Sequence, residues 1–214
     1  MEVFQAIQAR HTIREFTSEP LEPAMVQKLI SAGFAAPSND HMRQWHFITL
    51  DDRILREKIL SQVHHPLDRE GSRAVINRWG LTDPIQREMY LIGIPLQYSM
   101  LLNAGSLILP FFAQSSPLLN SKTLSDLNSF ASIWCCIENV LIAAAAEGIL
   151  GVTRIPFKEE STFVKKALQI PEQYEFPCWL ALGYPSPQAK KAKQVSIDVA
   201  DRIHPNEWPE KIKG

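Results

Sequence analysis

The stretch FASIWCCIENVLIAAAAEG, residues 130–148, predicts the central helix of the fold. A helix that is apolar nearly all round is buried on most sides, in a core or at a subunit interface. The four alanines at 143–146 permit close approach of a second helix. Glu138 and Asn139 are the polar exceptions, and we expect them to satisfy neighbouring backbone groups, with catalysis as the alternative. The helix is expected to begin within 121–125 and to end at about Glu147, before Gly148.

Shorter periodic segments surround this helix. We expect helices over 3–9, from Pro23 to Pro37, from 51 or 52 to about 63, over 85–103 with kinks at Gly93 and Pro95, and over 158–168. Strands are expected over 45–50, 106–114, 149–155 and 176–184. The pattern predicts an α+β fold of about four strands separated by helices, with at least one right-handed crossover.

The chain is expected to form one domain over residues 1–214, with an excursion at about 64–103. Residues 64–84 lack periodicity, so we interpret them as a lid or excursion, with a disordered surface loop as the alternative. Trp79 favours some packing there. The tail carries Trp208 and little core of its own, so we expect it to lie on another subunit or on its own domain.

Charge and cysteine content narrow the class of protein. The chain has 22 Lys and Arg against 23 Asp and Glu, which predicts no binding to nucleic acid or to an anionic membrane. The three cysteines suggest neither disulfides nor a metal site. No signal peptide is recognisable, and no uncharged apolar run reaches membrane-spanning length. We expect a soluble cytoplasmic protein.

The stretch RHTIREF, residues 10–16, is a candidate anion site. Arginine offers a planar fork of donors to phosphate oxygens, and a threonine hydroxyl with free backbone N–H groups can add further bonds. A solvated basic turn is the alternative, because exposed arginines are common.

Four separated motifs together resemble the FMN-dependent nitroreductase family. They are residues 10–16, then Ala36-Pro37-Ser38 up to Trp45-His46-Phe47, then 139–151, and last 181–185. The resemblance spans nearly the whole chain in the family's order. It implies a nitroreductase-like fold, with a central mostly antiparallel or mixed β-sheet flanked by helices, in an interlocked homodimer with FMN at the subunit interface.

The same resemblance assigns the site residues. Arg10, His11, Thr12 and Arg14 would hold the phosphate and ribityl chain, joined at the phosphate by a lysine of the 190–193 segment, with Lys191 and Lys193 as our choices. Pro37, Ser38, Asn39 and His41 would lie along the flavin from the partner subunit, and Thr153, Ile155 and Pro156 would approach the isoalloxazine. His41, Arg43 and Gln44 stand where the family usually has Asn and Gln-Pro, and Thr153–Pro156 lacks the acidic-glycine pair of well-studied members.

The implied function is hydride transfer from NADH or NADPH, through the flavin, to a nitroaromatic, a quinone or another small flat acceptor. No catalytic side chain and no metal ligand is expected, because the flavin carries the electrons. Trp79, Tyr90 and Tyr98 are candidate stackers for the substrate, with ordinary packing as the alternative. Two other functions stay open: a non-catalytic flavin-binding or sensing module, and a family member that acts on a specialised substrate.

Overall fold

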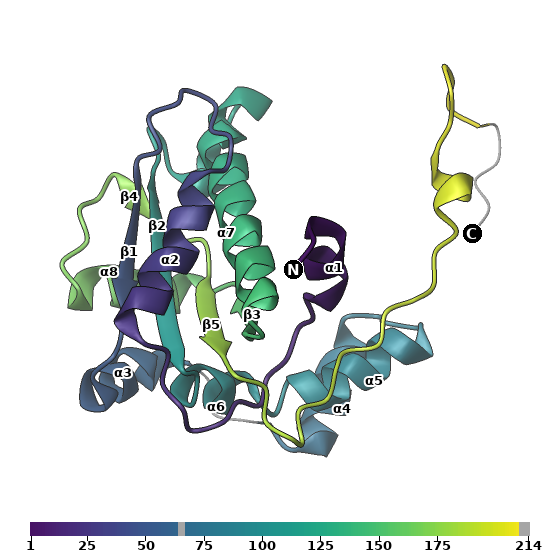
Figure 1. The fold of residues 1–214 in the computed structure, drawn as a ribbon, viewed down its shortest axis with the longest axis horizontal. Helices are drawn as coiled ribbons and strands as arrows, with labels where there is room; N and C mark the ends of the chain where they lie inside the picture. Colours follow the sequence, from purple (N-terminus) through teal and green to yellow (C-terminus); the bar gives the residue numbers. More distant parts are fainter. Residues whose placement is uncertain (64–66, 210–214) are drawn as a thin grey trace.

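A computed structural model describes residues 1–63 and 67–209 and shows an α+β fold around one sheet (Figure 1). The strands are β1 (Trp45–Thr49), β2 (Ser106–Ala113), β3 (Leu150–Arg154), β4 (Tyr174–Glu175) and β5 (Trp179–Gly183). The sheet order is β1-β2-β5-β3, with β4 paired to β2, and every one of these pairs is antiparallel. The α+β prediction is therefore confirmed, with one strand more than expected.

Helix α7 (Asn128–Ala146) packs on one face of the sheet together with α2 (Pro23–Phe34). The two helices approach closely at Gly33, where an added Cβ would lie 2.8 Å from Cys136 Sγ and from Val140 Cγ2. The core on this side includes Leu29, Ile137 and Leu180. The predicted central helix is confirmed, although it begins at Asn128, after a 3-10 turn at Leu124–Leu127.

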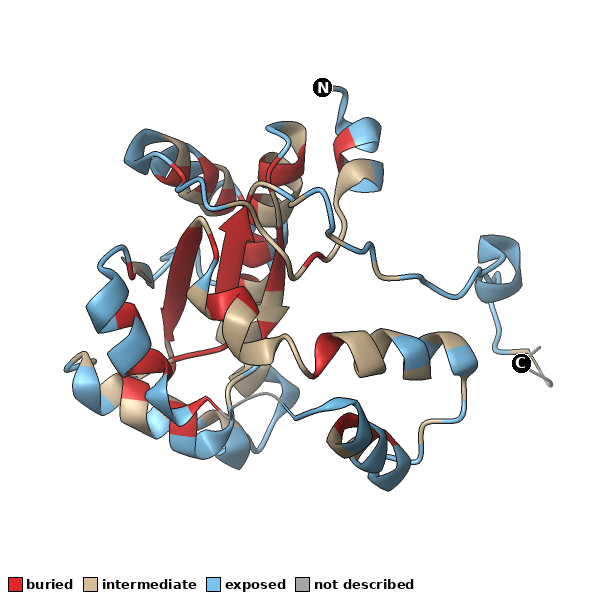
Figure 2. Ribbon diagram, turned by 90° about the horizontal axis from the view of Figure 1, so that it is seen from below, coloured by how far each residue is buried: buried red, intermediate tan, exposed pale blue. Residues whose placement is uncertain are grey.

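The opposite face of the sheet packs against shorter helices, namely α3 (Arg53–Ile59), α6 (Gln97–Leu102) and α8 (Lys158–Ala167). Leu60, Leu101 and Trp179 belong to the core on this side. Figure 2 shows the central strands buried between the two layers. The sheet is thus covered on both faces, as the apolar strand sequences require.

The expected excursion is more regular than the sequence indicates. The structure contains α4 (Arg69–Arg78), which Asp68 caps by accepting a 2.7 Å bond from the backbone N–H of Gly71. Only Ser72 and Ile76 of α4 are buried, and the helix packs mainly on α5 (Pro84–Gly93). The alternative of a disordered surface loop is therefore wrong for residues 67–84, and the lid or excursion stays a prediction. The helix was not expected because a face that buries two residues leaves little apolar periodicity in the sequence. Residues 64–66 of that prediction lie outside the described residues.

Instead of one kinked helix over 85–103, the chain forms the separate helices α5 and α6. Pro95 lies between them and has no N–H to continue the helical ladder.

The polar residues of α7 also differ in part from expectation. Asn139 donates to the backbone oxygen of Ala32, as expected, but Glu138 forms an ion pair with Arg10 at 3.4 Å.

Apolar side chains remain exposed at both ends of the chain. On α1 (Val3–Ala9) they are Val3, Phe4 and Ile7, and on the tail they are Val195, Ile197, Val199, Ile203 and Trp208. Figure 1 shows the tail running away from the sheet, with the short turn η4 (Val199–Arg202) far from the helical layers.

By length and composition alone, residues 124–146 could also cross a membrane, a test that core helices of soluble proteins pass as well.

Candidate functional site

The stretch Arg10–Phe16 is an extended segment that borders the sheet, so the alternative of a solvated basic turn is wrong. Thr12 forms a parallel bridge with Gly151, and the backbone N–H of Ile13 donates to Gly151 O at 3.2 Å. Phe16 forms an antiparallel bridge with Pro185. Ile13 is buried, with 1% exposure, which fixes the segment while its neighbours Thr12 and Arg14 point elsewhere.

Arg14 lines a cavity of about 510 Å³ together with the start of the tail. One wall carries Lys190, Lys191 and Lys193. The other carries side chains of α5, which are mainly apolar, such as Met89 and Ile92, and include the carboxylate of Glu88. The guanidinium of Arg14 lies against Gly93, where an added Cβ would be 3.1 Å from its Cζ. The fold therefore joins residues from the two ends of the sequence in one cationic cavity with an apolar wall.

Positive charge exceeds negative charge around this cavity, because its lining carries Arg14 and three lysines against one carboxylate, Glu88. The pKa of His11 is lowered, first by burial and then by the nearby charges of Lys191 and Arg10. Burial also lowers the pKa of Arg14, and Tyr90 opposes that shift. Arg10 forms an ion pair with Glu138 of α7, and the side chain of Glu138 is 53% exposed. An excess of cations beside a histidine whose pKa is lowered favours the binding of an anion.

Other predicted residues lie elsewhere in the same chain. Pro37, Ser38, Asn39 and His41 belong to the loop between α2 and β1, which Figure 1 shows at the opposite end of the molecule from α5. The backbone N–H of Asn39 donates to Ser132 Oγ at 3.2 Å, near the beginning of α7. The Ser38 hydroxyl is buried and has no hydrogen-bond partner among residues 1–63 and 67–209. Within one chain, this group does not line the cavity beside Arg14.

The segment at the end of β3 presents Ile155 outward and holds Arg154 inward. Thr153 pairs with Leu180 in the sheet, and Ile155 is 68% exposed, whereas Pro156 is partly buried. Arg154 is 8% exposed and forms a bidentate pair with Glu160 of α8, at 2.5 and 2.7 Å. Its Nε donates to Gln97 of α6. No motif in the sequence identifies this network, because its members come from three separate elements.

The three candidate aromatic stackers lie outside the lining of this cavity. Trp79 and Tyr90 pack edge to face with ring centroids 5.3 Å apart, joining α4 to α5. None of Trp79, Tyr90 and Tyr98 is among the side chains that line the cavity beside Arg14. This arrangement favours the packing alternative for the Trp79–Tyr90 pair.

Known proteins resemble this chain over most of its length. A putative NADH dehydrogenase/NAD(P)H nitroreductase from Archaeoglobus fulgidus is 25% identical over 211 residues, which is 97% of this chain and 99% of the relative. A 5,6-dimethylbenzimidazole synthase from Rhodospirillum rubrum is 24% identical over 187 residues, covering 83% and 79%. The crystal structure of oxidized iodotyrosine deiodinase bound to FMN and 3-iodo-L-tyrosine has a TM-score of 0.71 at 18% identity, covering 97% and 100%.

The family model described as the nitroreductase family matches residues 7–184. This match includes the segment Arg10–Phe16, the whole sheet and the central helix α7. Because it spans most of the chain, the resemblance found in the sequence is confirmed, and the protein belongs to the nitroreductase family.

Proposed function

We propose that this chain binds FMN in the cavity beside Arg14 and transfers hydride from NADH or NADPH to a nitroaromatic, a quinone or a similar flat acceptor. The observation that carries the proposal is the cationic wall formed by Arg14, Lys191 and Lys193 on one cavity. A phosphate dianion requires two or more cations together with other donors. His11 and Thr12 precede Arg14 in the same extended segment, and they supply an imidazole and a hydroxyl.

The shape of the cavity fits the rest of the cofactor. Its volume of about 510 Å³ lies within the range of small-molecule sites. Ile85, Met89 and Ile92 of α5 offer an apolar surface to a flat ring. FMN, when bound, would accept a hydride from the nicotinamide and pass the electrons on. The residues of this chain would bind the phosphate, orient the ring and exclude water.

We further propose that the site is completed in a homodimer. Ser38, Asn39 and His41 lie far from Arg14 within one chain, so they would contribute to a shared site only from a second copy. The exposed apolar side chains of α1 and the tail support an interface, because large apolar patches on a protein surface mark contact sites. Light scattering on the purified protein would give the mass directly, and a monomer would contradict this part of the proposal.

A specialised substrate is the second candidate function. The relatives include proteins named 5,6-dimethylbenzimidazole synthase and iodotyrosine deiodinase, so likeness to the family leaves the acceptor open. A flavin-binding module without catalysis is the third. Anaerobic titration with NADH and with NADPH separates the oxidoreductase from the binding module, and product analysis would reveal a specialised substrate. Rapid bleaching supports the oxidoreductase, whereas bound FMN that neither nucleotide reduces supports the binding module.

The cofactor assignment is tested by the visible spectrum of the purified protein and by measured FMN affinity. Arg14→Ala should weaken FMN binding by about 10- to 100-fold, because it removes one charge-assisted hydrogen bond to phosphate. Arg53→Ala is the matched control, since Arg53 is an exposed arginine of α3 that pairs with Glu57. Equal FMN affinity in the Arg14 variant and the native protein would refute the phosphate assignment.

A further inference from the structure

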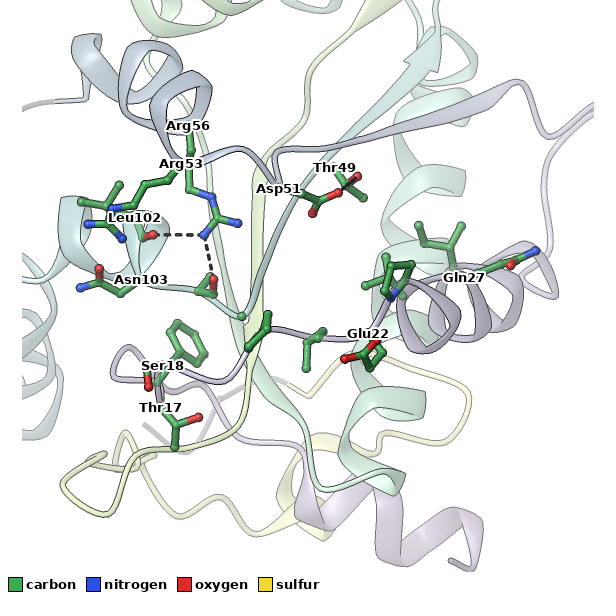
Figure 3. A pocket seen from close by; sticks show the side chains of 18 residues that line it. Thr17, Ser18, Glu22, Gln27, Thr49, Asp51, Arg53, Arg56, Leu102 and Asn103 are labelled. Carbon is green, nitrogen blue, oxygen red and sulfur yellow. Dashed lines mark hydrogen bonds between the residues drawn. The ribbon is translucent and has the colours of Figure 1, made fainter.

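A second groove, larger than the candidate cofactor cavity, lies between the beginning of α2 and the end of β1. Its volume is about 870 Å³. Figure 3 shows side chains from α2, α3, the loop before α2 and the turn before β2 around it. Leu21, Val26 and Ala104 form a buried apolar floor, and the rim is exposed. Arg14 and the lysines of the tail do not line this groove, so it is separate from the proposed FMN site.

Arg56 lies in this groove with a fixed orientation. Its Nε donates to Leu50 O at 2.7 Å, and its Nη1 donates to Leu102 O at 3.1 Å and to Ala104 O at 2.8 Å. The residue is 8% exposed. Among the described residues no hydrogen bond engages Nη2, so one edge of a buried, rigid cation still has donors to offer. A buried charged donor favours an acceptor.

Asp51, an exposed residue, lies across the groove from the side chain of Arg56 (Figure 3). Its Oδ2 accepts a 2.9 Å bond from Thr49 Oγ1, which orients the carboxylate. Asp51 and Arg56 form no ion pair in the part of the chain that the structure describes. A fixed donor and an oriented acceptor therefore stand opposite each other above an apolar floor.

We propose that this groove binds a neutral, flat apolar molecule whose primary carboxamide or cyclic amide bridges Arg56 and Asp51. The carbonyl oxygen of such a group accepts from Arg56 Nη2, while its N–H donates to the Asp51 carboxylate. A primary or cyclic amide presents donor and acceptor on one edge. The lining carries two cations, Arg53 and Arg56, and two anions, Glu22 and Asp51, so the site has no excess charge to attract an ion.

The alternative ligand classes fit this site less well. A carboxylate would satisfy Arg56 but would face the negative charge of Asp51. An ammonium would satisfy Asp51 but would face Arg56. A hydrocarbon would leave the Arg56 donors and the Asp51 acceptor without partners in the bound state, which is unfavourable in a partly buried site. Only a group with both functions satisfies both side chains.

Benzamide is the probe, and its binding to the full-length protein is followed by the backbone NMR signals of Asn103 and Gly105, which line the groove. N,N-dimethylbenzamide keeps the carbonyl but has no N–H. We expect benzamide to bind about tenfold more tightly than this analogue, as one charge-assisted hydrogen bond implies. Benzoate should bind more weakly than benzamide.

The variant Asp51→Ala tests the bridge, and it leaves the structural bonds of Arg56 in place. In this variant benzamide and its dimethyl analogue should bind alike, and benzoate should gain affinity. Glu22→Ala is the control, because Glu22 is another carboxylate on the rim and makes no side-chain cap to α2. It should leave the preference for benzamide unchanged.

Three results would overturn the proposal. One is equal binding of benzamide and N,N-dimethylbenzamide to the native protein, and another is a preference that survives in Asp51→Ala. The third is a benzamide titration that leaves Asn103 and Gly105 unshifted, as expected if the tail of a second copy fills the groove.

Discussion

The buried pair between Arg154 and Glu160 provides the sharpest stability prediction. The side chains are 7% and 2% exposed, and both terminal nitrogens of the guanidinium contact the carboxylate. Glu160→Gln keeps the shape of the side chain but leaves a buried arginine without its counter-charge. Removing one partner of such a pair costs about 3–5 kcal/mol. A chain of this size loses about 2–4 °C of melting temperature per kcal/mol, so we expect a decrease of roughly 6–20 °C.

Chemical denaturation and calorimetry would measure this loss, with Glu159→Gln as the matched control on the exposed side of the same helical turn. A double variant, Arg154→Met with Glu160→Leu, should recover most of the stability, because a buried ion pair can often be replaced by apolar residues of similar volume. The reasoning fails if Glu160→Gln unfolds within about 1 kcal/mol of the native protein, since the pair would then be solvated in solution.

Two further changes address the segment that borders the cavity. The pKa of His11 lies below 6.5, so the folded state binds fewer protons than the unfolded state, and stability should decline as the pH falls from 6.5 through the lowered value. NMR titration should show this low pKa, and Lys191→Ala should raise it; a pKa that Lys191→Ala leaves unchanged would contradict the assigned charge contact. Gly151→Ala would drive a Cβ into Ala181 O and to 2.5 Å from Leu182 Cδ2, so we expect a loss of about 1–3 kcal/mol or more in unfolding free energy. A variant as stable as the native protein would show that β3 and β5 can separate at this point.

The sequence by itself determined the elements that carry strong local signals. The helix around residues 130–146 is apolar on most of its surface, and the strands are short apolar runs between breakers, so their periods predict them directly. The family followed from four short motifs that stand in the family's order along the chain, because each motif can be recognised from its own residues. The helix α4 was missed, since a helix that buries only Ser72 and Ile76 has almost no apolar period to detect.

Only the tertiary structure decided which side chains share a site. It brought Arg14 together with Lys191 and Lys193, which lie more than 170 residues away in the sequence. It also set Asp51 opposite Arg56 and joined Arg154 to Glu160 and Gln97. Local sequence patterns report the period of one element, whereas these contacts depend on how separate elements pack across the sheet. Their chemistry was therefore visible in the sequence only as isolated charges.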